Sequence, residues 1–473
     1  MAERFYITTP IYYANGEPHI GHTYTTVAAD ILARWHRETG HETFFSSGMD
    51  EHGAKIEEKA REMKIEPQEY VDGIAAEFQS AWEKLNISND NFLRTTGAAH
   101  IEAVQKALRF MHDKGDIYLS KYEGLYCRGC EQYKSERDLI NGLCPDHQIA
   151  PEKMSEECYT FRMSKYQDEL LKKIKKGELR VLPDNRKKEI ISFYEKEGLE
   201  DVSFSRKNVN WGIPVPWDKP HTVYVWADAF LNYLTGLGWD GTNGDKLKFW
   251  PPSVHLMSKD ILRVHATIWP AMLLSLGLPL PKTIFAHGYF LIDGQKMSKS
   301  IGNVIKPDDL IKRYGVDAAR YLIISAAVFG NDADIGYGKF DEKYNADLAN
   351  GLGNLVARIS NLLEKNGLEL KLKAGRDKKL AKSHKDCMEN FKFDESLKLL
   401  WQKLRAADES LSSAKPWKME DKKKIKKILE PIAQDILNAA VLLKPFMPES
   451  AEKIIKQFTD KQIKKNEPLF LRI

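Results

Sequence analysis

Arg4-Phe5-Tyr6-Ile7-Thr8-Thr9 opens the stretch that decides the fold, and His19-Ile20-Gly21-His22 closes it. The first segment is rich in aromatic and β-branched residues, which is typical of a strand, and Asn15-Gly16 marks a loop after it. From His22 onward apolar residues recur at helical spacing, and the run at 43–46 has the composition of a second strand. Strand, loop, helix and strand in this order predict a βαβ unit in a parallel sheet.

Outside this unit the α/β pattern is interrupted once and later ends. Between 117 and about 206 the sequence breaks into short aromatic segments, a cysteine cluster and a lysine-rich helix, which indicates an insertion. Strand-like runs at 222–226, 254–257 and 283–286 then alternate with helical stretches, whereas only helical periodicity remains after about Phe340. We predict an α/β protein with a split Rossmann-type parallel sheet (1–116 and 207–290), an inserted connective domain (117–206), a linker region (291–340) and an all-α helical bundle (341–473).

Composition narrows the classes of protein that fit. A length of 473 residues exceeds what one hydrophobic core usually supports, and Lys+Arg 71 against Asp+Glu 67 permits nucleic-acid binding without requiring it. The N-terminus lacks the blocks of a signal peptide, and the longest apolar run, at 271–278, is far below the ~20 residues of a membrane span. Four of the five cysteines cluster between Cys127 and Cys158, which does not fit a disulfide framework. We expect a cytoplasmic multidomain protein that does not enter a membrane.

Two separated segments have the chemistry of a phosphate site. His19, Gly21 and His22 lie where a helix start offers unpaired backbone N–H groups and a positive dipole end, although polar residues are common there without function. Lys296-Met297-Ser298-Lys299-Ser300 predicts a loop whose two ammonium groups could hold a pyrophosphate, although lysine-rich loops are usually solvated surface. Each segment alone is a weak signal, and the pair is much stronger.

A third motif has the spacing of a metal site. Cys127-x2-Cys130-x13-Cys144-x2-His147 offers three thiolates and one imidazole in two chelating pairs, which suits tetrahedral zinc. The alternative is four reduced structural residues. A closed set of four ligands leaves no position for water, so we predict one structural zinc in the insertion.

The motifs at 19–22 and 296–300 together resemble the two signatures of the class I aminoacyl-tRNA synthetases and match them at every position. Within that class the chain resembles the methionyl-tRNA synthetases over essentially its whole length, most clearly in Ile11-Tyr12-Tyr13-Ala14-Asn15-Gly16, Gly48-Met49-Asp50-Glu51-His52-Gly53, Tyr224-Val225-Trp226-Ala227-Asp228-Ala229 and His287-Gly288-Tyr289. The resemblance implies a ligase that activates L-methionine with ATP and Mg²⁺ and transfers it to tRNA(Met). A synthetase for leucine, isoleucine or valine would carry a large editing domain, for which the insertion is too short. An inactive RNA-binding relative is disfavoured because both signatures are intact.

The resemblance also implies roles for single residues. ATP binding and charge stabilisation are expected from His19, Gly21, His22, Asp260, Lys296 and Lys299. Methionine is expected to contact Ile11, Tyr13, Asp50, Trp226, Tyr233, Ile261 and His265, with Asp50 on the ammonium group. Arg206 would meet the substrate carboxylate region. Without the resemblance, Trp226 and Tyr233 are more typical of core aromatics.

The helical part contains a candidate site for the anticodon. Asn354 and Arg358 share one helix face, and Trp417 follows a proline. The family uses the matching Asn and Arg to hydrogen-bond anticodon bases and the Trp to stack on the first base, which suits an unstacked single strand. Taken alone, a solvated helix pair and a packed Trp anchor are the commoner outcomes. Many relatives continue into an OB-fold dimerisation module that this sequence lacks, so we expect a monomer.

Overall fold

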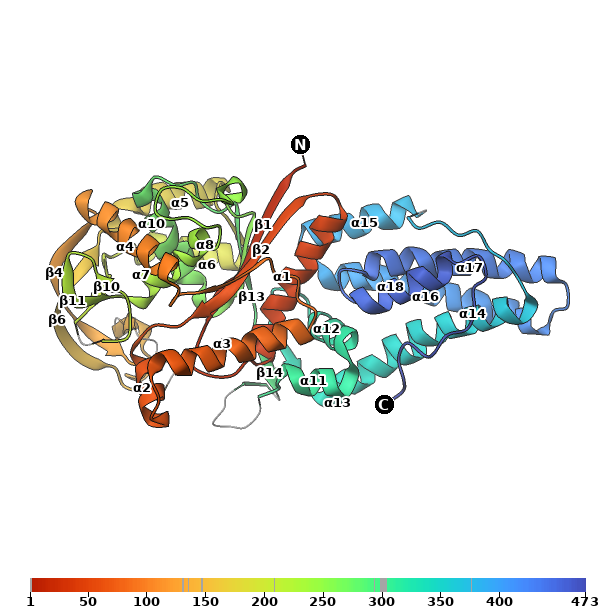
Figure 1. Cartoon of the computed structure of the whole chain (residues 1–473). Helices are drawn as coiled ribbons and strands as arrows, with labels where there is room; N and C mark the ends of the chain where they lie inside the picture. Colours follow the sequence, from red (N-terminus) through yellow and green to blue (C-terminus); the bar gives the residue numbers. More distant parts are fainter. Residues whose placement is uncertain are drawn as a thin grey trace.

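The computed structural model describes residues 2–129, 132–134, 136–145, 148–207, 209–292, 294–297, 304–375 and 377–473. Cys130, His147, Lys299 and the side chain of Lys296 lie outside this description. The molecule is elongated, with the α/β part at one end and the long helices α14, α16, α17 and α18 at the other (Figure 1). None of the helices within the described ranges combines the length and apolarity that crossing a membrane requires.

The central sheet has six parallel strands in the order β3-β2-β1-β12-β13-β7. Its members are β1 (Arg4–Tyr13), β2 (Glu42–Asp50), β3 (Asn91–Arg94), β12 (Val254–Ser258), β13 (Thr283–His287) and β7 (Arg180–Leu182). The two halves of the chain meet where β1 pairs with β12, with Ile7 opposite Val254. The predicted parallel sheet is confirmed, and it is assembled from segments on both sides of the 117–206 region.

Both faces of this sheet are covered, which explains its near-continuous apolar strands. Leu256 and Phe285 join the core around α1 (Ile20–Glu38), whereas their neighbours Met257 and Ile284 join the core around α10 (Ile268–Leu276). The remaining helices of this part are α2 (Ala54–Met63), α3 (Pro67–Lys84), α4 (Ala98–Asp113), α7 (Val225–Ala229), α8 (Asn232–Thr235) and α9 (Leu262–Ala266). The sheet is therefore a buried platform whose strand ends are held in fixed positions.

The region expected as an insertion is built on a long antiparallel pair. β4 (Ile117–Cys127) pairs with β6 (Glu152–Phe161), and the same sheet includes β5 (Gln132–Lys134) and β8 (Val202–Ser203). Helices α5 (Gln167–Lys176) and α6 (Asp184–Lys196) follow, and β9 (Ser205–Arg206), β10 (Pro214–Val215) and β11 (Asp218–Val223) form a small sheet. One expectation needs correction here. β7 lies inside 117–206 but pairs with β13, so the region is not wholly outside the central sheet.

The region expected as a linker is also folded. β14 (Phe290–Ile292), β15 (Gln295–Lys296) and β16 (Ala333–Ile335) form a small sheet, and α11 (Pro307–Tyr314) and α12 (Val316–Ile324) lie between its strands in the chain. All residues of α12 except Val316 are buried. This helix therefore lies inside the molecule, between the α/β part and the C-terminal helices (Figure 1).

The C-terminal region is helical, as predicted. It comprises α13 (Tyr337–Lys343), the π-helix η5 (Tyr344–Gly353), α14 (Asn354–Asn366), α15 (Lys378–Glu389), α16 (Phe393–Ala414), the short 3-10 turn η6 (Pro416–Lys418), α17 (Lys422–Leu443) and α18 (Pro448–Thr459). The predicted apolar stripe of α16, from Leu397 to Leu411, is buried. Its side chains belong to the same continuous hydrophobic core as Ile7 of β1 and Val27 of α1.

Candidate active site

One cavity of about 530 Å³ opens at the carboxyl ends of β1, β2, β12 and β13. Ligands bind at this edge of open parallel sheets because the loops diverge there. Among its lining are all the predicted ATP-site and methionine-site residues whose side chains the structure describes: Ile11, Tyr13, His19, Gly21, His22, Asp50, Trp226, Tyr233, Asp260, Ile261 and His265. The fold thus brings residues from both halves of the chain to one site.

His19 and His22 stand at the start of α1 with stacked rings, whose centroids are 3.7 Å apart. Nδ1 of His19 accepts the Gly21 backbone N–H at 3.1 Å, and Nδ1 of His22 accepts the His19 backbone N–H at 3.3 Å. A ring nitrogen that accepts a hydrogen bond carries no proton, so each neutral ring carries its proton on Nε2. Both rings can therefore donate to an anion at this helix N-terminus, where the dipole also favours negative charge.

The position of the His19 ring explains the glycine at residue 21. A Cβ at residue 21 would lie 2.9 Å from Cε1 of His19, so a larger residue would displace that ring from its capping position. The methyl carbon of Met297 lies 3.9 Å from the same point, and Met297 lines the cavity. The segment that begins at Lys296 therefore approaches the start of α1, as the pairing of the two motifs predicts.

Tyr233 and His265 form the inner wall of the cavity. Nδ1 of His265 donates to the Ile261 carbonyl at 2.8 Å, and its Nε2 therefore accepts the hydroxyl proton of Tyr233 at 2.8 Å. Burial lowers the pKa of His265 to about 4, so the ring is neutral at pH 7. Two uncharged rings with mutually satisfied polar atoms leave an apolar, polarisable wall, which suits a thioether side chain.

Trp226 is carried by α7, and a buried carboxylate fixes that helix. Asp228 accepts hydrogen bonds from Nδ1 of His52 and Nε2 of His100, both at 2.7 Å. Burial alone would raise the pKa of Asp228, but the two imidazoles outweigh it and hold this pKa below its ordinary value. Since His52 follows Asp50 at the end of β2, the same contact ties the Asp50 side of the cavity to the Trp226 side.

Other lining residues received no role from the sequence: Lys55, Phe230, His287 and Tyr289. Phe230 lies four residues after Trp226, so helical spacing could have identified it. His287 donates from Nδ1 to the Gly288 carbonyl at 2.7 Å and hydrogen-bonds Thr25 at 2.6 Å, and burial lowers its pKa to about 4. Both ring nitrogens of His287 are thus engaged in holding the wall.

Arg206 is not among the described residues that line the cavity. Its guanidinium donates to the Ser203 hydroxyl at 2.7 Å and to the Ser205 carbonyl at 2.8 Å, and it lies 4.3 Å from the ring centroid of Tyr224. Tyr224 immediately precedes α7. Arg206 therefore contacts the residue that precedes the Trp226 helix, and its expected contact with the substrate carboxylate stays a prediction.

Two of the four predicted zinc ligands are described. Cys127 ends β4 and Cys144 lies beyond β5, and both thiols are fully buried. The Cys144 backbone N–H donates to the Ile149 carbonyl, and the Cys144 carbonyl accepts from the Gln148 backbone N–H. Within the described part of the chain there is no group of three metal-binding side chains, and Cys130 and His147 lie outside that part.

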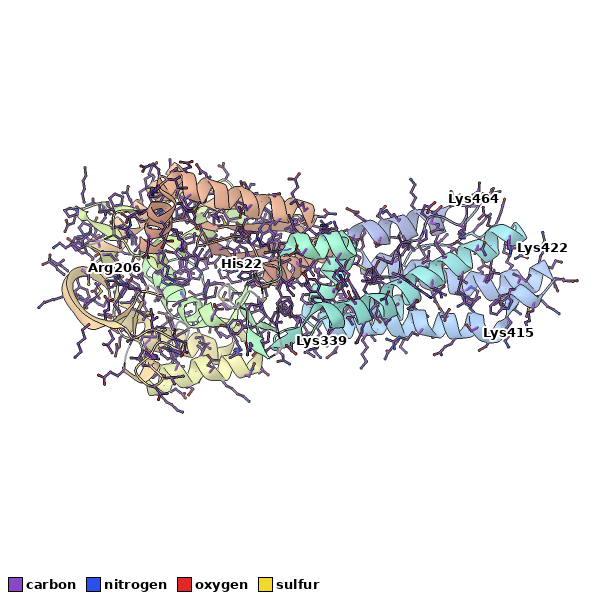
Figure 2. All side chains as sticks on the ribbon, turned by 90° about the horizontal axis from the view of Figure 1, so that it is seen from below. His22, Arg206, Lys339, Lys415, Lys422 and Lys464 are labelled. Carbon is purple, nitrogen blue, oxygen red and sulfur yellow. The ribbon has the colours of Figure 1, made fainter. Side chains whose placement is uncertain are left out.

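The predicted anticodon residues lie at the far end of the helical region. Arg358 donates to Asp408 at 2.5 Å, and its guanidinium lies 5.8 Å from the ring centroid of Trp417. Asn354 is exposed, and Trp417 is 47% exposed, which rules out a packed Trp anchor. Lys415 and Lys422, on either side of Trp417 in the sequence, lie at the tip of the helical part, far from His22 within the α/β part (Figure 2).

Comparisons of the sequence and of the structure with known proteins identify the same family. A family model described as tRNA synthetases class I (M) matches residues 5–158 and 146–360. The methionine–tRNA ligase of Caldanaerobacter subterraneus is 42% identical and covers 97% of this chain and 74% of that enzyme. The corresponding ligase of Bacillus subtilis is 40% identical and covers 99% of this chain and 78% of that enzyme.

A solved structure extends the likeness to three dimensions. Mycobacterium tuberculosis methionyl-tRNA synthetase in complex with methionyl-adenylate matches with a TM-score of 0.93 and 34% identity, over 99% of this chain and 100% of that chain. The apo form of the same protein matches with a TM-score of 0.84. Sequence identity above 30% over the full length, together with a near-complete structural match, shows a family relationship as well as a shared fold.

Proposed function

The chain belongs to the methionine-specific class I tRNA synthetases, and from this premise we propose how its residues divide the reaction. The protein is a methionine–tRNA ligase. It activates L-methionine with ATP to give methionyl adenylate and pyrophosphate, and it then transfers methionine to the 3′-terminal ribose of tRNA(Met). The residue roles below are proposals that rest on the geometry of the cavity.

Adenylate formation needs positioning and charge stabilisation more than a protein nucleophile. The methionine carboxylate attacks the α-phosphorus in line, and negative charge grows on the phosphate oxygens. His19 and His22, whose ring protons are held on Nε2, would donate to these oxygens at the N-terminus of α1. Asp260, which accepts from the Ser258 hydroxyl, would accept from the ATP ribose.

The other end of the cavity would hold methionine. Asp50, at the end of β2, would bind the ammonium group, which places the carboxylate between it and the histidines. The thioether would lie among seven side chains with apolar or polarisable surfaces: Ile11, Tyr13, Trp226, Phe230, Tyr233, Ile261 and His265. The observation that carries this proposal is that one cavity gathers the phosphate-binding helix start and this apolar wall.

We assign the pyrophosphate to Lys296 and Lys299, with Mg²⁺ accompanying ATP. Met297 lies between these two lysines in the sequence, and its side chain lines the cavity near the start of α1, which supports this assignment. Ammonium groups and a bound cation would neutralise charge that develops as pyrophosphate leaves.

One structural zinc would be held by Cys127, Cys130, Cys144 and His147. The fully buried thiols of Cys127 and Cys144 fit this assignment because a buried thiolate requires a cation beside it. The spacing of Cys144 and His147 in the sequence, with two residues between them, suits a chelating pair. When bound, zinc supplies folding energy to the tip of the β4–β6 region, and no step of the reaction passes through it.

Asn354, Arg358 and Trp417 would bind the anticodon. The exposed indole, with a guanidinium beside it, offers a platform on which an unstacked base can lie. The domain limits of the sequence analysis stay a proposal, with β7 reassigned to the central sheet. The expected monomer and the cytoplasmic location stay predictions, which sedimentation analysis and cell fractionation test.

ATP–pyrophosphate exchange with each of the 20 amino acids tests the assignment of the cavity. Exchange should depend strongly on methionine and be weak with leucine, isoleucine and valine, because the wall suits a flexible thioether. Aminoacylation of tRNA(Met) by the same preparation tests the second step. Exchange driven equally well by another aliphatic amino acid would contradict the proposed pocket.

A further inference from the structure

Arg320 of α12 is fully buried, and its guanidinium group donates hydrogen bonds to several partners. Its Nη2 donates to Asp30 at 2.6 Å and to the Pro445 carbonyl at 3.0 Å, and its Nε donates to the Phe446 carbonyl at 3.1 Å. Its Nη1 donates to the Leu85 carbonyl at 3.1 Å. A buried guanidinium is costly unless its donors are matched in this way, and the four partners come from three separate parts of the chain.

These hydrogen-bond partners of Arg320 belong to elements of the α/β part and of the helical region. Asp30 lies on α1, eight residues after His22, which is ~12 Å along the helix at 1.5 Å per residue. Leu85 ends α3. Pro445 and Phe446 form the turn between α17 and α18 in the helical region. One side chain thus joins the phosphate-binding helix to the C-terminal helices.

Asp30 is itself held firmly. It also accepts from Nε of Arg34 at 2.8 Å and from the backbone and hydroxyl of Ser88 at 2.7 Å and 2.6 Å. Burial would raise the pKa of Asp30, but Arg320, Arg34 and Ser88 outweigh it and hold this pKa below its ordinary value. The carboxylate is therefore ionised at pH 7, and the buried pair is charged.

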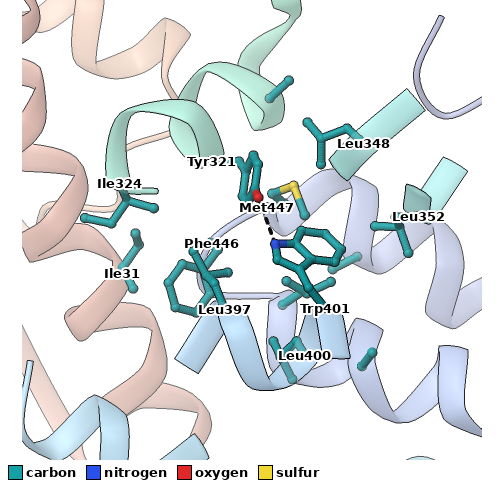
Figure 3. Packing of buried hydrophobic residues seen from close by; sticks show 14 of the residues in the cluster. Ile31, Tyr321, Ile324, Leu348, Leu352, Leu397, Leu400, Trp401, Phe446 and Met447 are labelled. Atoms are coloured by element: carbon teal, nitrogen blue, oxygen red, sulfur yellow. Dashed lines mark hydrogen bonds between the residues drawn. The ribbon is translucent and has the colours of Figure 1, made fainter. Parts of the chain in front are cut away.

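The rest of α12 makes further contacts with the helical region. Tyr321 donates its hydroxyl proton to Asp347 at 2.6 Å and accepts the indole N–H of Trp401 at 2.7 Å, a bond visible in Figure 3. Asp317 accepts the backbone N–H of Ser450 at the start of α18. Three side chains of one short buried helix therefore contact η5, α16, the α17–α18 turn and the first turn of α18.

We propose that Arg320 is a positioning residue that couples anticodon binding in the helical region to the phosphate-binding end of α1. This rests on the proposed anticodon role of that region. Binding of a tRNA at Trp417 displaces helices that are linked through the 445–446 turn to Arg320. Arg320 in turn is hydrogen-bonded to Asp30 of α1. Chains of packed and hydrogen-bonded groups with rigid helices are one way in which distant sites are energetically coupled.

Arg320→Lys is the variant that tests the coupling. Lysine keeps a cation for Asp30 but loses the planar fork that reaches both carbonyls of the turn. Arg34→Lys is the matched control, because Arg34 also donates to Asp30 and its other hydrogen bonds within the described residues go to Asn86 rather than to the 445–446 turn. Three rates are measured for each folded variant: methionine-dependent pyrophosphate exchange, charging of full-length tRNA, and charging of an acceptor-stem RNA without an anticodon.

We expect Arg320→Lys to reduce the advantage of full-length tRNA over the acceptor-stem RNA about 10-fold, within the usual range of coupling energies. Exchange and tRNA affinity should stay within about twofold of the parent. Arg34→Lys should keep the full advantage. An unchanged advantage in Arg320→Lys would overturn the proposal, and so would equal losses in all three rates, since these indicate a purely structural role.

Tyr321→Phe keeps the proposal testable if Arg320→Lys does not fold. It removes the hydroxyl that joins α12 to Asp347 and Trp401 and leaves the Asp30 pair intact. The same selective loss for full-length tRNA is expected, and its absence in this variant would refute the coupling. A parent enzyme without methionine-dependent exchange would instead refute the proposed function, so the two failures are distinguishable.

Discussion

At the scale of single residues, the cavity histidines owe their chemistry to what each ring nitrogen already contacts. His19 and His22 accept backbone N–H groups at Nδ1, so their remaining protons stand on Nε2 and are available to an anion. His265 and His287 donate from Nδ1 to carbonyls instead, and burial lowers the pKa of each to about 4. Histidine side chains therefore serve as hydrogen-bond donors at one end of the cavity and as parts of an uncharged wall at the other.

Tyr233→Phe tests the neutral wall. Loss of the hydroxyl leaves Nε2 of His265 without its donor, which costs about 0.5–1.5 kcal/mol and should raise KM for methionine ~2- to 13-fold with little change in kcat. Pyrophosphate exchange at varied methionine measures this. Tyr194→Phe is the control, since its hydroxyl donates to the neighbouring Ala266 carbonyl but is not among the described cavity-lining groups. Equal KM values in the two variants would contradict the role.

Lys299→Ala tests the proposed role of Lys299 in binding the pyrophosphate leaving group. Its ammonium should act mainly on charge that develops in the transition state, so adenylate formation should slow ~10²-fold or more while methionine affinity stays nearly unchanged. Single-turnover kinetics with a separate binding measurement distinguish the two effects. Lys306→Ala is the control, because Lys306 pairs with Glu17 outside the cavity.

At the scale of elements, long periodic segments could be predicted and short ones could not. The stripe from Leu397 to Leu411 and the β1–α1–β2 order follow from apolar spacing, which local sequence carries. β7 has three residues, too few to show any alternation, and only its pairing with β13 defines it as a strand. The π-helix at 344–353 contains two glycines and two asparagines, which indicate a weak helix former but carry no signal specific to the π form.

The proposed zinc site gives a prediction of its own. One tightly held zinc per chain is expected, and Cys127→Ser or Cys144→Ser should release it and disorder the tip of the β4–β6 region while the helical region stays folded. Metal analysis by mass spectrometry and limited proteolysis measure these effects. Cys158→Ser is the control, because Cys158 is buried in β6 and lies outside the predicted ligand set. A zinc-free protein with reduced cysteines would refute the site.

The link between α1 and α12 should make stability depend on acidic pH. The folded-state pKa of Asp30 lies below its unfolded value, so its contribution is present above about pH 4 and is lost as the pH falls through the folded pKa. Asp30→Asn should therefore flatten the fall in the free energy of unfolding between about pH 5 and pH 2. Denaturant titrations across this range measure the slope. If Asp30→Asn keeps the slope of the parent protein, other carboxylates dominate the pH dependence of the free energy of unfolding.

At the scale of the whole molecule, the cavity and the proposed anticodon residues are far apart but share one core. Residues of β1, α12 and α17 belong to the same hydrophobic cluster, and Arg320 bonds to Asp30 across 290 residues of sequence. Such long-range partners leave no local signal, so the sequence offers hypotheses for both sites but none for the connection between them. The residue roles stay predictions from motif spacing and family resemblance, whereas the tautomers of the histidines required coordinates.

Trp417→Ala tests the separation of the two sites. The exposed indole should lose base stacking worth roughly 1–3 kcal/mol, so kcat/KM for tRNA should fall ~5- to 150-fold, while pyrophosphate exchange should barely change because it needs only the cavity. Trp401→Ala is the matched comparison in the same region. Trp401 is only 7% exposed and bonds to Tyr321, so its removal should cost about 3–5 kcal/mol of stability and lower the melting temperature. If Trp417→Ala instead melts as low as Trp401→Ala and loses both activities, the stacking role is wrong; if its melting point holds and only charging fails, Trp417 belongs to the anticodon site.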